Sequence, residues 1–256
     1  MKAVILAGGL GSRLSEETLN KPKPLVEVGN YPIIWHIMKT YSYFGINEFI
    51  ICCGYKGYMI KEFFANYLLH TRDVEIDIHQ NKISTISKSS GMDNWKISLI
   101  DTGENTQTGG RLLRVKEFIN DTFLMTYGDG VSNVDIKELI NFHKNKKTVG
   151  TMTVVNPPGR FGLPTINKDK VVKFNEKKVT NDGWINGGFF VLEPEIFKFL
   201  RGDQEIFEDY PLNTISEQGQ LSAYHHKNFW HPMDTLRDKK FLDDLWYSKK
   251  APWKIW

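Results

Sequence analysis

The most constraining feature of this sequence is a glycine-rich loop that begins directly after a short apolar run. Residues 2–7 are KAVILA, and the segment LAGGLGSRL (6–14) places Gly8, Gly9 and Gly11 within four positions. A short apolar run that ends in a turn is typical of a buried strand. Glycines let the backbone turn tightly, so that several N–H groups can point at one anion. We therefore expect a first buried strand that leads into an anion-binding loop.

Neither of the two best-known phosphate-loop patterns fits this segment. The dinucleotide pattern G-x-G-x-x-G would need a third glycine where Leu14 stands, and a Walker A loop would need a lysine where Ser12-Arg13 follow the last glycine. Arg13 still offers donors that match phosphate geometry. KPKPLVEVG (21–29) adds Lys21 and Lys23 on a stretch stiffened by prolines. A plain strand–turn–helix connection with surface lysines is the alternative, but the two segments together favour phosphate binding.

Strand and helix patterns alternate along the first 150 residues. Strand patterns cover 2–7, 48–53, 74–79, 95–101 and 122–127, and helical patterns cover 32–45, 57–69, 110–119 and 133–145. This alternation predicts an α/β fold with a mostly parallel sheet and helices on both faces. Ligands bind at the carboxyl ends of the strands in such sheets, which directs attention to the loops after Leu6, Asp101 and Tyr127.

The pattern changes after residue 155. Residues 156–164 form a loop by their prolines and glycines, 171–178 and 183–192 are strand-like, and two helical patterns close the chain. No linker or repeat separates the two parts. We expect a single domain over 1–256, with an α/β core at 1–155 and, at 156–256, a part that includes a small β-rich subregion and C-terminal helices.

Charge and composition exclude several classes of function. The net charge of +3, from 33 basic and 30 acidic residues, is too even to indicate nucleic-acid binding. No apolar run approaches the length that spans a bilayer, and the N-terminal apolar stretch is too short for a signal peptide. The only cysteines, Cys52 and Cys53, are adjacent, which fits a reduced, cytoplasmic protein.

Two isolated aspartates are candidate metal ligands. Asp129 in TYGDG (126–130) follows a strand pattern between glycines, and Asp234 stands in HPMDT (231–235). Mg²⁺ is usually held by one or two carboxylates plus phosphates and water, which such a pair would suit. A helix N-cap or turn role is the alternative for each. His225, His226 and His231 lack a neighbouring cysteine or an HExxH pattern, so we do not expect a zinc site.

These segments together resemble a known family. LAGGLGSRL followed by KPKPLVEV is similar to the signature of the sugar-1-phosphate nucleotidyltransferases. Segments along the rest of the chain narrow the resemblance to the branch that transfers a cytidylyl group from CTP to α-D-glucose 1-phosphate; they are SEET, GYKGYMIKEFFANY, DTGENTQTGGRL, TYGDGV, INGGFFVLEP, HPMDTLRDKKFLDDLW and APWKIW. Ser12 replaces the usual threonine, and EKK (176–178) lacks a proline often found after Glu-Lys.

The resemblance implies a Rossmann-like, mostly parallel but mixed sheet of the nucleotide-diphospho-sugar transferase type. It implies that residues 1–155 are the nucleotide-binding core and that 156–256 are the sugar-phosphate-binding part, with a small β-rich sugar-binding subregion and the C-terminal helices. It also implies a direct, Mg²⁺-assisted in-line displacement with Arg13 and Lys23 as catalytic cations and Asp129 and Asp234 as metal ligands. The implied nucleotide-binding residues are Leu6, Ala7, Gly8, Gly9, Leu10, Gly11, Ser12, Arg13, Lys23, Thr108, Gly109, Arg111 and Gly128. The implied sugar-phosphate residues are Glu176, Lys177, Asn186 and Gly187.

Arg111 is the candidate for base recognition. Its donors could satisfy O2 and N3 of cytosine, where uracil places an N–H, while a helix-surface cation is the alternative. Uridylyl or thymidylyl transfer to a hexose 1-phosphate, a regulatory protein that has lost the chemistry, and a dinucleotide-dependent oxidoreductase are the competing functions. CTP and glucose 1-phosphate are the expected partners, in a homo-oligomer, with no nucleic acid and no membrane.

Overall fold

The apolar run at the start of the chain forms the central strand of the main sheet. The computed structural model describes residues 1–86, 93–156, 163–167, 170–175 and 183–256. Strand β1 (Lys2–Leu6) pairs in parallel with β4 (Glu48–Cys53) on one side and β8 (Phe123–Tyr127) on the other. Because both faces of β1 are covered, four of its five residues are buried apolar side chains.

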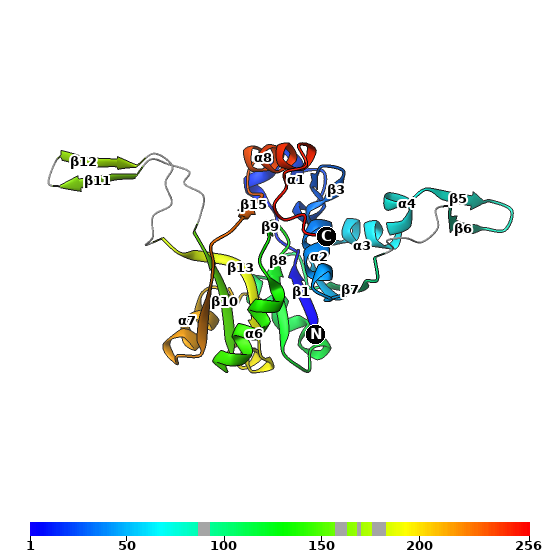
Figure 1. Cartoon of the computed structure of the whole chain (residues 1–256). Coiled ribbons are helices and arrows are strands. Elements are labelled where there is room, and N and C mark those ends of the chain that lie inside the picture. Colours follow the sequence, from blue (N-terminus) through cyan, green and yellow to red (C-terminus); the bar gives the residue numbers. More distant parts are fainter. Residues whose placement is uncertain (87–92, 157–162, 168–169, 176–182) are drawn as a thin grey trace.

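The main sheet has seven strands in the order β14-β10-β13-β8-β1-β4-β7 (Figure 1). Its remaining strands are β7 (Lys96–Asp101), β10 (Gly150–Val155), β13 (Ile185–Leu192) and β14 (Leu221–His226). Only β13 runs antiparallel, against β8 and β10. The prediction of a mostly parallel, mixed sheet is confirmed. Since β13 and β14 complete the sheet begun by β1, both parts of the chain contribute to one layer.

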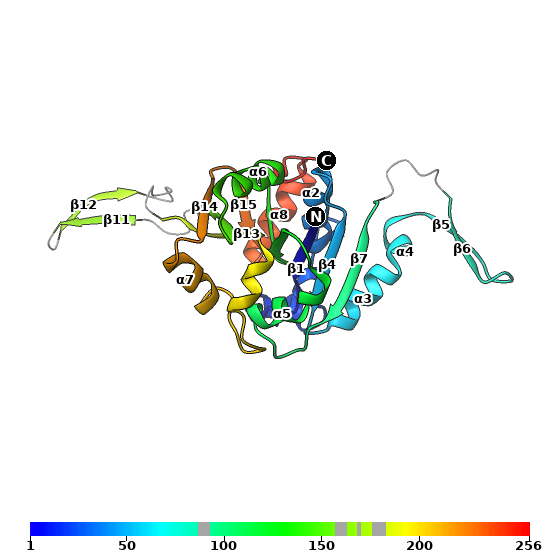
Figure 2. The same cartoon turned by 90° about the horizontal axis from the view of Figure 1, so that it is seen from below.

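Helices cover both faces of this sheet (Figure 2). Helices α2 (Ile33–Tyr43), α6 (Ile136–Lys146) and α8 (Leu236–Tyr247) pack one buried cluster against one face. Helix α5 (Thr108–Arg114), the 3₁₀ segment η4 (Pro194–Phe199) and α7 (Tyr210–Glu217) supply a second cluster on the other. The apolar side chains of each helix recur on its inward side, so burial of that side accounts for the placement.

Several predicted boundaries need correction. The predicted strand 74–79 is β5 (Val74–Asp77), which pairs with β6 (Lys82–Thr85) in a separate hairpin and does not join the main sheet. The predicted helix 57–69 is two helices, α3 (Gly57–Ala65) and α4 (Tyr67–Thr71), which meet at Asn66. The predicted helix 110–119 ends at Arg114 and continues as η3 (Lys116–Phe118).

Short elements complete the body around the carboxyl ends of the strands. They are η1 (Ser12–Leu14), α1 (Ser15–Thr18), η2 (Lys23–Leu25), the pair β2 (Glu27–Val28) with β3 (Tyr31–Pro32), and the pair β9 (Gly130–Ser132) with β15 (Trp230–Pro232). The β9–β15 pair matters for the site because it brings the segment before α8 next to the loop after β8.

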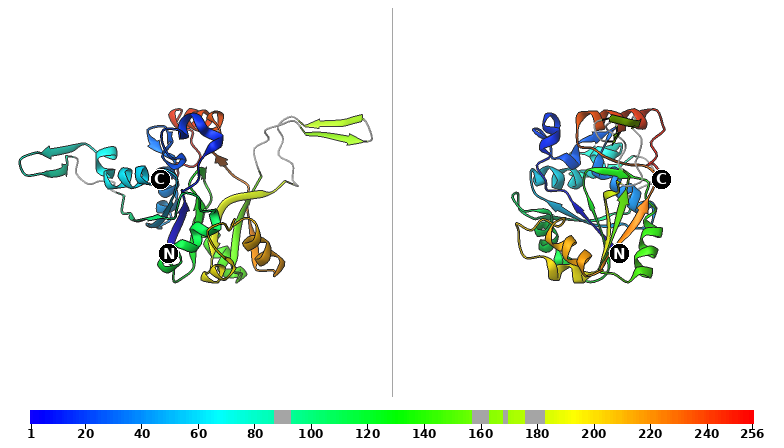
Figure 3. Two further views of the ribbon diagram at one scale, coloured as in Figure 1. Left: turned by 180° about the vertical axis from the view of Figure 1, so that it is seen from behind. Right: turned by 90° about the vertical axis from the view of Figure 1, so that its left-hand side faces the viewer.

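Two hairpins lie on opposite sides of the body (Figures 1 and 3). One is β5–β6, and the other is β11 (Leu163–Asn167) with β12 (Lys170–Asn175). Strand β11 begins inside the stretch 156–164 that was predicted to be a loop, and β12 lies within the predicted strand 171–178 except for its first residue. Within the described residues, no helix is long and apolar enough to cross a membrane.

Candidate functional site

A cavity of about 280 Å³ opens at the carboxyl ends of β1 and β8. Backbone hydrogen bonds join the glycine loop region to its neighbours on both sides. Gly128 N–H, after β8, donates to the carbonyl of Leu6 at 3.0 Å, and Tyr55 N–H, after β4, donates to that of Gly8 at 3.1 Å. Most of the predicted nucleotide-binding residues line this cavity. They are Leu6, Ala7, Gly8, Gly9, Gly11, Ser12, Arg13, Lys23, Thr108, Arg111 and Gly128.

Two predicted nucleotide-binding residues lie outside this lining. Leu10 is exposed at the tip of the loop, and Gly109 is buried with its N–H bonded to the carbonyl of Glu205 at 2.9 Å. Gly109 therefore anchors the start of α5 against the loop before α7. Residues that line the cavity without having been predicted are Pro24, Thr106, Gln107 and Tyr127.

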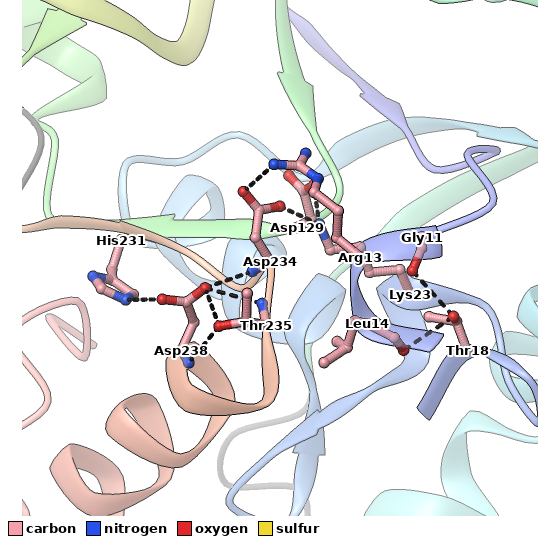
Figure 4. A network of polar contacts seen from close by, with 10 residues as sticks. All are labelled: Gly11, Arg13, Leu14, Thr18, Lys23, Asp129, His231, Asp234, Thr235 and Asp238. Atoms are coloured by element: carbon pink, nitrogen blue, oxygen red, sulfur yellow. Dashed lines mark hydrogen bonds and ion pairs between the residues drawn. The ribbon is translucent and has the colours of Figure 1, made fainter. Parts of the chain in front are cut away.

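The glycine loop ends in a left-handed turn at Gly11, whose φ of 65° favours glycine. Its carbonyl accepts the N–H of Leu14 at 2.9 Å, which starts η1 and brings Arg13 to the mouth of the cavity. The Thr18 hydroxyl is hydrogen-bonded to the carbonyls of both Gly11 (3.1 Å) and Leu14 (3.0 Å) (Figure 4). The loop is thus fixed by its own side-chain and backbone contacts.

One lysine and one arginine form ion pairs with the two predicted metal ligands beside this loop. Lys23 Nζ lies 2.7 Å from Asp129 Oδ2 and 2.8 Å from Asp234 Oδ1, and Arg13 Nη1 lies 2.8 Å from Asp234 Oδ2 (Figure 4). Burial alone would lower the pKa of Lys23, but the two carboxylates outweigh it and raise that pKa above its ordinary value. Residues from four separate segments therefore form one charged cluster.

A second layer of hydrogen bonds holds Asp234 in place. Asp238, in the first turn of α8, is buried, and its Oδ2 accepts N–H bonds from Asp234 (3.2 Å) and Thr235 (2.9 Å). The Thr235 hydroxyl completes a capping box with Asp238, and His231 Nε2 lies 3.2 Å from Asp238 Oδ1. The predicted N-cap role thus falls to Thr235, which leaves the Asp234 carboxylate facing the two cations.

The structure shows a role of Arg111 that the sequence did not predict. Its side chain is buried, Nη2 donates to the carbonyls of Gly8 (2.9 Å) and Glu104 (3.0 Å), and Nη1 donates to Thr102 and Gly103 (2.9 and 2.7 Å). A Cβ on Gly8 would lie 2.1 Å from Arg111 Nη1, so this approach requires glycine. Through these bonds Arg111 fastens the glycine loop to the loop after β7. Arg111 also lines the cavity, and its contact with cytosine O2 and N3 stays a prediction.

The predicted sugar-phosphate residues are only partly placed. Asn186 and Gly187 line a smaller cavity that adjoins the first, sharing Tyr127 and Asp129 with it. Trp230 Nε1 donates to the carbonyl of Gly187 at 2.7 Å, which fixes that segment. Glu176 and Lys177 lie outside the described residues.

The donor set fits a magnesium ion better than a structural zinc. Asp129 lines a cavity with space for phosphates, and Asp234 lies beside it on the same lysine. Mg²⁺ is usually held by one or two carboxylates together with phosphates and water. The described residues hold no group of three or more His, Cys, Asp or Glu side chains arranged around one point. His226 instead contacts Ser132 and the carbonyl of Phe229, and His231 contacts Asp238.

Comparison with known proteins identifies the family. The family model described as nucleotidyl transferase matches residues 2–235. The chain belongs to the nucleotidyl transferase family. It is 54% identical, over the full length of both chains, to the glucose-1-phosphate cytidylyltransferases of Salmonella typhimurium and Salmonella typhi.

Solved structures agree on the fold of this nucleotidyl transferase. A UDP-glucose pyrophosphorylase complexed with UDP-glucose superposes with a TM-score of 0.69 at 16% identity, covering 97% of this chain and 98% of the other. The inositol-1-phosphate CTP transferase from T. maritima superposes with a TM-score of 0.66 at 14% identity, covering 99% and 96%. The predicted fold type and enzyme class are confirmed.

Proposed function

We propose that this nucleotidyl transferase transfers the cytidylyl group of CTP to α-D-glucose 1-phosphate, giving CDP-glucose and pyrophosphate. The observation that carries the proposal is the cluster in which Lys23 contacts both Asp129 and Asp234 beside the glycine loop. The full-length identity of 54% to enzymes named for this reaction supports the choice of substrates.

The reaction is a direct displacement at phosphorus. A phosphate oxygen of the sugar forms a bond to the α-phosphorus of CTP, and the bond from that phosphorus to the pyrophosphate oxygen breaks. The nucleophile is already an anion, so no general base is needed. Catalysis then depends on positioning and on neutralising charge.

Different residues of the chain would position the substrates and neutralise their charge. The glycine loop and Arg13 line the cavity, so loop N–H groups and the guanidinium of Arg13 would neutralise the charge that develops on the leaving pyrophosphate. Lys23 is placed to reduce the repulsion between the two anionic substrates. Asp129 and Asp234 would hold Mg²⁺, which when bound supplies positive charge to the triphosphate and fixes its orientation.

One assay tests the proposal. Pyrophosphate release is measured with each of CTP, UTP, dTTP, ATP and GTP in the presence of glucose 1-phosphate, with and without Mg²⁺. We expect release that depends on Mg²⁺ and is fastest with CTP. Faster release with UTP or dTTP would favour uridylyl or thymidylyl transfer, and no release with any nucleotide would refute transfer to glucose 1-phosphate.

We also infer a homo-oligomer in the cytoplasm. Hairpin β5–β6 carries Ile76 and Ile83, paired across the strands and about half exposed, and Ile78 beside them is 84% exposed. An isolated two-stranded hairpin is marginal in water, and a second copy of the chain would cover this apolar surface. Light scattering on the purified chain tests the assembly.

Burial raises the pKa of both Cys52 and Cys53, which fits unreactive thiols in a reducing compartment such as the cytoplasm.

A further inference from the structure

A chain of hydrogen bonds crosses from the nucleotide cavity to the smaller cavity beside it. The Thr108 hydroxyl donates to Glu208 Oε2 at 2.6 Å, and the Tyr127 hydroxyl donates to Glu208 Oε1. Asn186 Nδ2 then donates to the Tyr127 oxygen at 3.3 Å. Helix α5, strand β8 and strand β13 are thereby joined through one carboxylate in the loop before α7.

Both hydroxyls need an acceptor at this point. The Thr108 oxygen already accepts the N–H of Phe207 at 2.9 Å, and the Tyr127 oxygen accepts from Asn186. Each hydroxyl has a single proton, which leaves both protons directed at Glu208. A carboxylate has two acceptor oxygens and can take both, whereas an amide has one oxygen and would present N–H groups to the second hydroxyl.

The two ends of this chain line the two cavities. Thr108 lines the nucleotide cavity, Asn186 lines the smaller one, and Tyr127 lines both. Asn186 Oδ1 accepts the N–H of Gly188 at 2.8 Å, so both polar atoms of this amide are fixed by the protein. Nδ2 carries two hydrogens, and with one on Tyr127 the other can serve a hydroxyl-rich ligand in the smaller cavity.

We propose that Glu208 is a positioning residue that orients Tyr127 and, through it, Asn186 for the sugar phosphate. The inference rests on the proposed function, since it assigns the sugar phosphate to the smaller cavity. Glu208 acts without touching substrate: it fixes the phenol that fixes the amide. No sequence motif pointed to this residue.

The test compares Glu208→Gln, Tyr127→Phe and the double variant with Glu217→Gln, an exposed glutamate on α7 that serves as the matched control. Steady-state kinetics give kcat and the KM for glucose 1-phosphate and for CTP, and calorimetric titration with glucose 1-phosphate gives its affinity without turnover. Thermal unfolding shows whether each variant is folded.

We expect Glu208→Gln and Tyr127→Phe each to raise the KM and the dissociation constant for glucose 1-phosphate about tenfold, the effect of one lost hydrogen bond to a charged group. The changes in kcat should be smaller, and the double variant should be no worse than either single one, because both break the same chain. The control should match the wild type.

Two results would overturn the assignment. One is an unchanged KM for glucose 1-phosphate in both folded single variants. The other is a double variant whose defect is the product of the two single effects, since independent residues would give that outcome. A wild type that makes no CDP-glucose would refute the proposed function instead, and the calorimetric comparison would still decide the role of Glu208.

Discussion

Replacing Lys23 by methionine removes one positive charge from between two carboxylates while keeping most of the apolar stem. Only 10% of the Lys23 side chain and 13% of that of Asp234 are exposed, so both charges are largely withdrawn from water. Breaking a buried pair by removing one partner costs about 3–5 kcal/mol. Asp129 is 33% exposed and Asp234 keeps Arg13, so we expect a cost below that range, about 2–3 kcal/mol.

Urea unfolding of wild type and Lys23→Met measures this difference, and each titration is repeated with Mg²⁺. The two carboxylates freed of Lys23 should bind the ion, so Mg²⁺ should stabilise the variant more than the wild type. The value of kcat should fall by about 10²–10³. Lys21→Met is the control: its exposed pair with Glu27 at 3.2 Å should contribute at most about 1 kcal/mol. Equal stability of Lys23→Met and wild type, with the same response to Mg²⁺, would refute this account of the cluster.

Three further variants test other parts of the structure. Arg111→Ala should raise the KM for CTP and for UTP by the same factor, because its guanidinium holds the backbone of two loops at the cavity. A KM raised for CTP alone, measured across the nucleotide panel, would instead support a role in base recognition. Asp238→Asn should destabilise the fold by about 1–3 kcal/mol in urea unfolding and lower kcat/KM, because an amide cannot accept every N–H and O–H that now points at this carboxylate. Unchanged kinetics would show that Asp238 does not position Asp234 for the reaction. Burial lowers the pKa of His36 to about 4, so the folded state stays unprotonated while the unfolded state gains a proton below about pH 6.5. Stability should therefore fall by about 3 kcal/mol in total as the pH drops from 6.5 to 4, and His36→Asn should lose this dependence in pH-dependent unfolding while the exposed His79→Asn keeps it.

Sequence reasoning located the charged half of the site because its signals are local. The apolar run before Gly8, the prolines around Lys23 and the glycines around Asp129 each mark a strand end or a constrained loop within a few residues. Parallel strands bring such loops to one edge, so the meeting of these segments follows from the fold. Asp234 was a candidate as an isolated aspartate and through the family resemblance, and the β9–β15 pair accounts physically for its place beside the loop after β8.

The parts that sequence reasoning missed or misjudged depend on distant partners. The structural contacts of Arg111 were missed because nothing nearby in the sequence shows that two loops would present four oxygen acceptors to its terminal donors. Glu208 lies in a segment without a motif, and its importance appears only when Thr108 and Tyr127 meet it from other elements. Strand β5 alternates like a sheet strand, but period alone does not say which strand it pairs with.

The charge balance of the cluster gives a physical reason for a divalent ion in this reaction. Arg13 and Lys23 are matched by Asp129 and Asp234, so the four side chains together carry no net charge. A triphosphate and a sugar phosphate that arrive together would meet only loop N–H groups and a neutral cluster, which offsets little of their mutual repulsion. A divalent ion on the two carboxylates would release Lys23 and Arg13 toward the phosphates, so that one binding event adds its own charge and frees two more. The same pairing that stabilises the fold is thereby poised to be exchanged for substrate contacts.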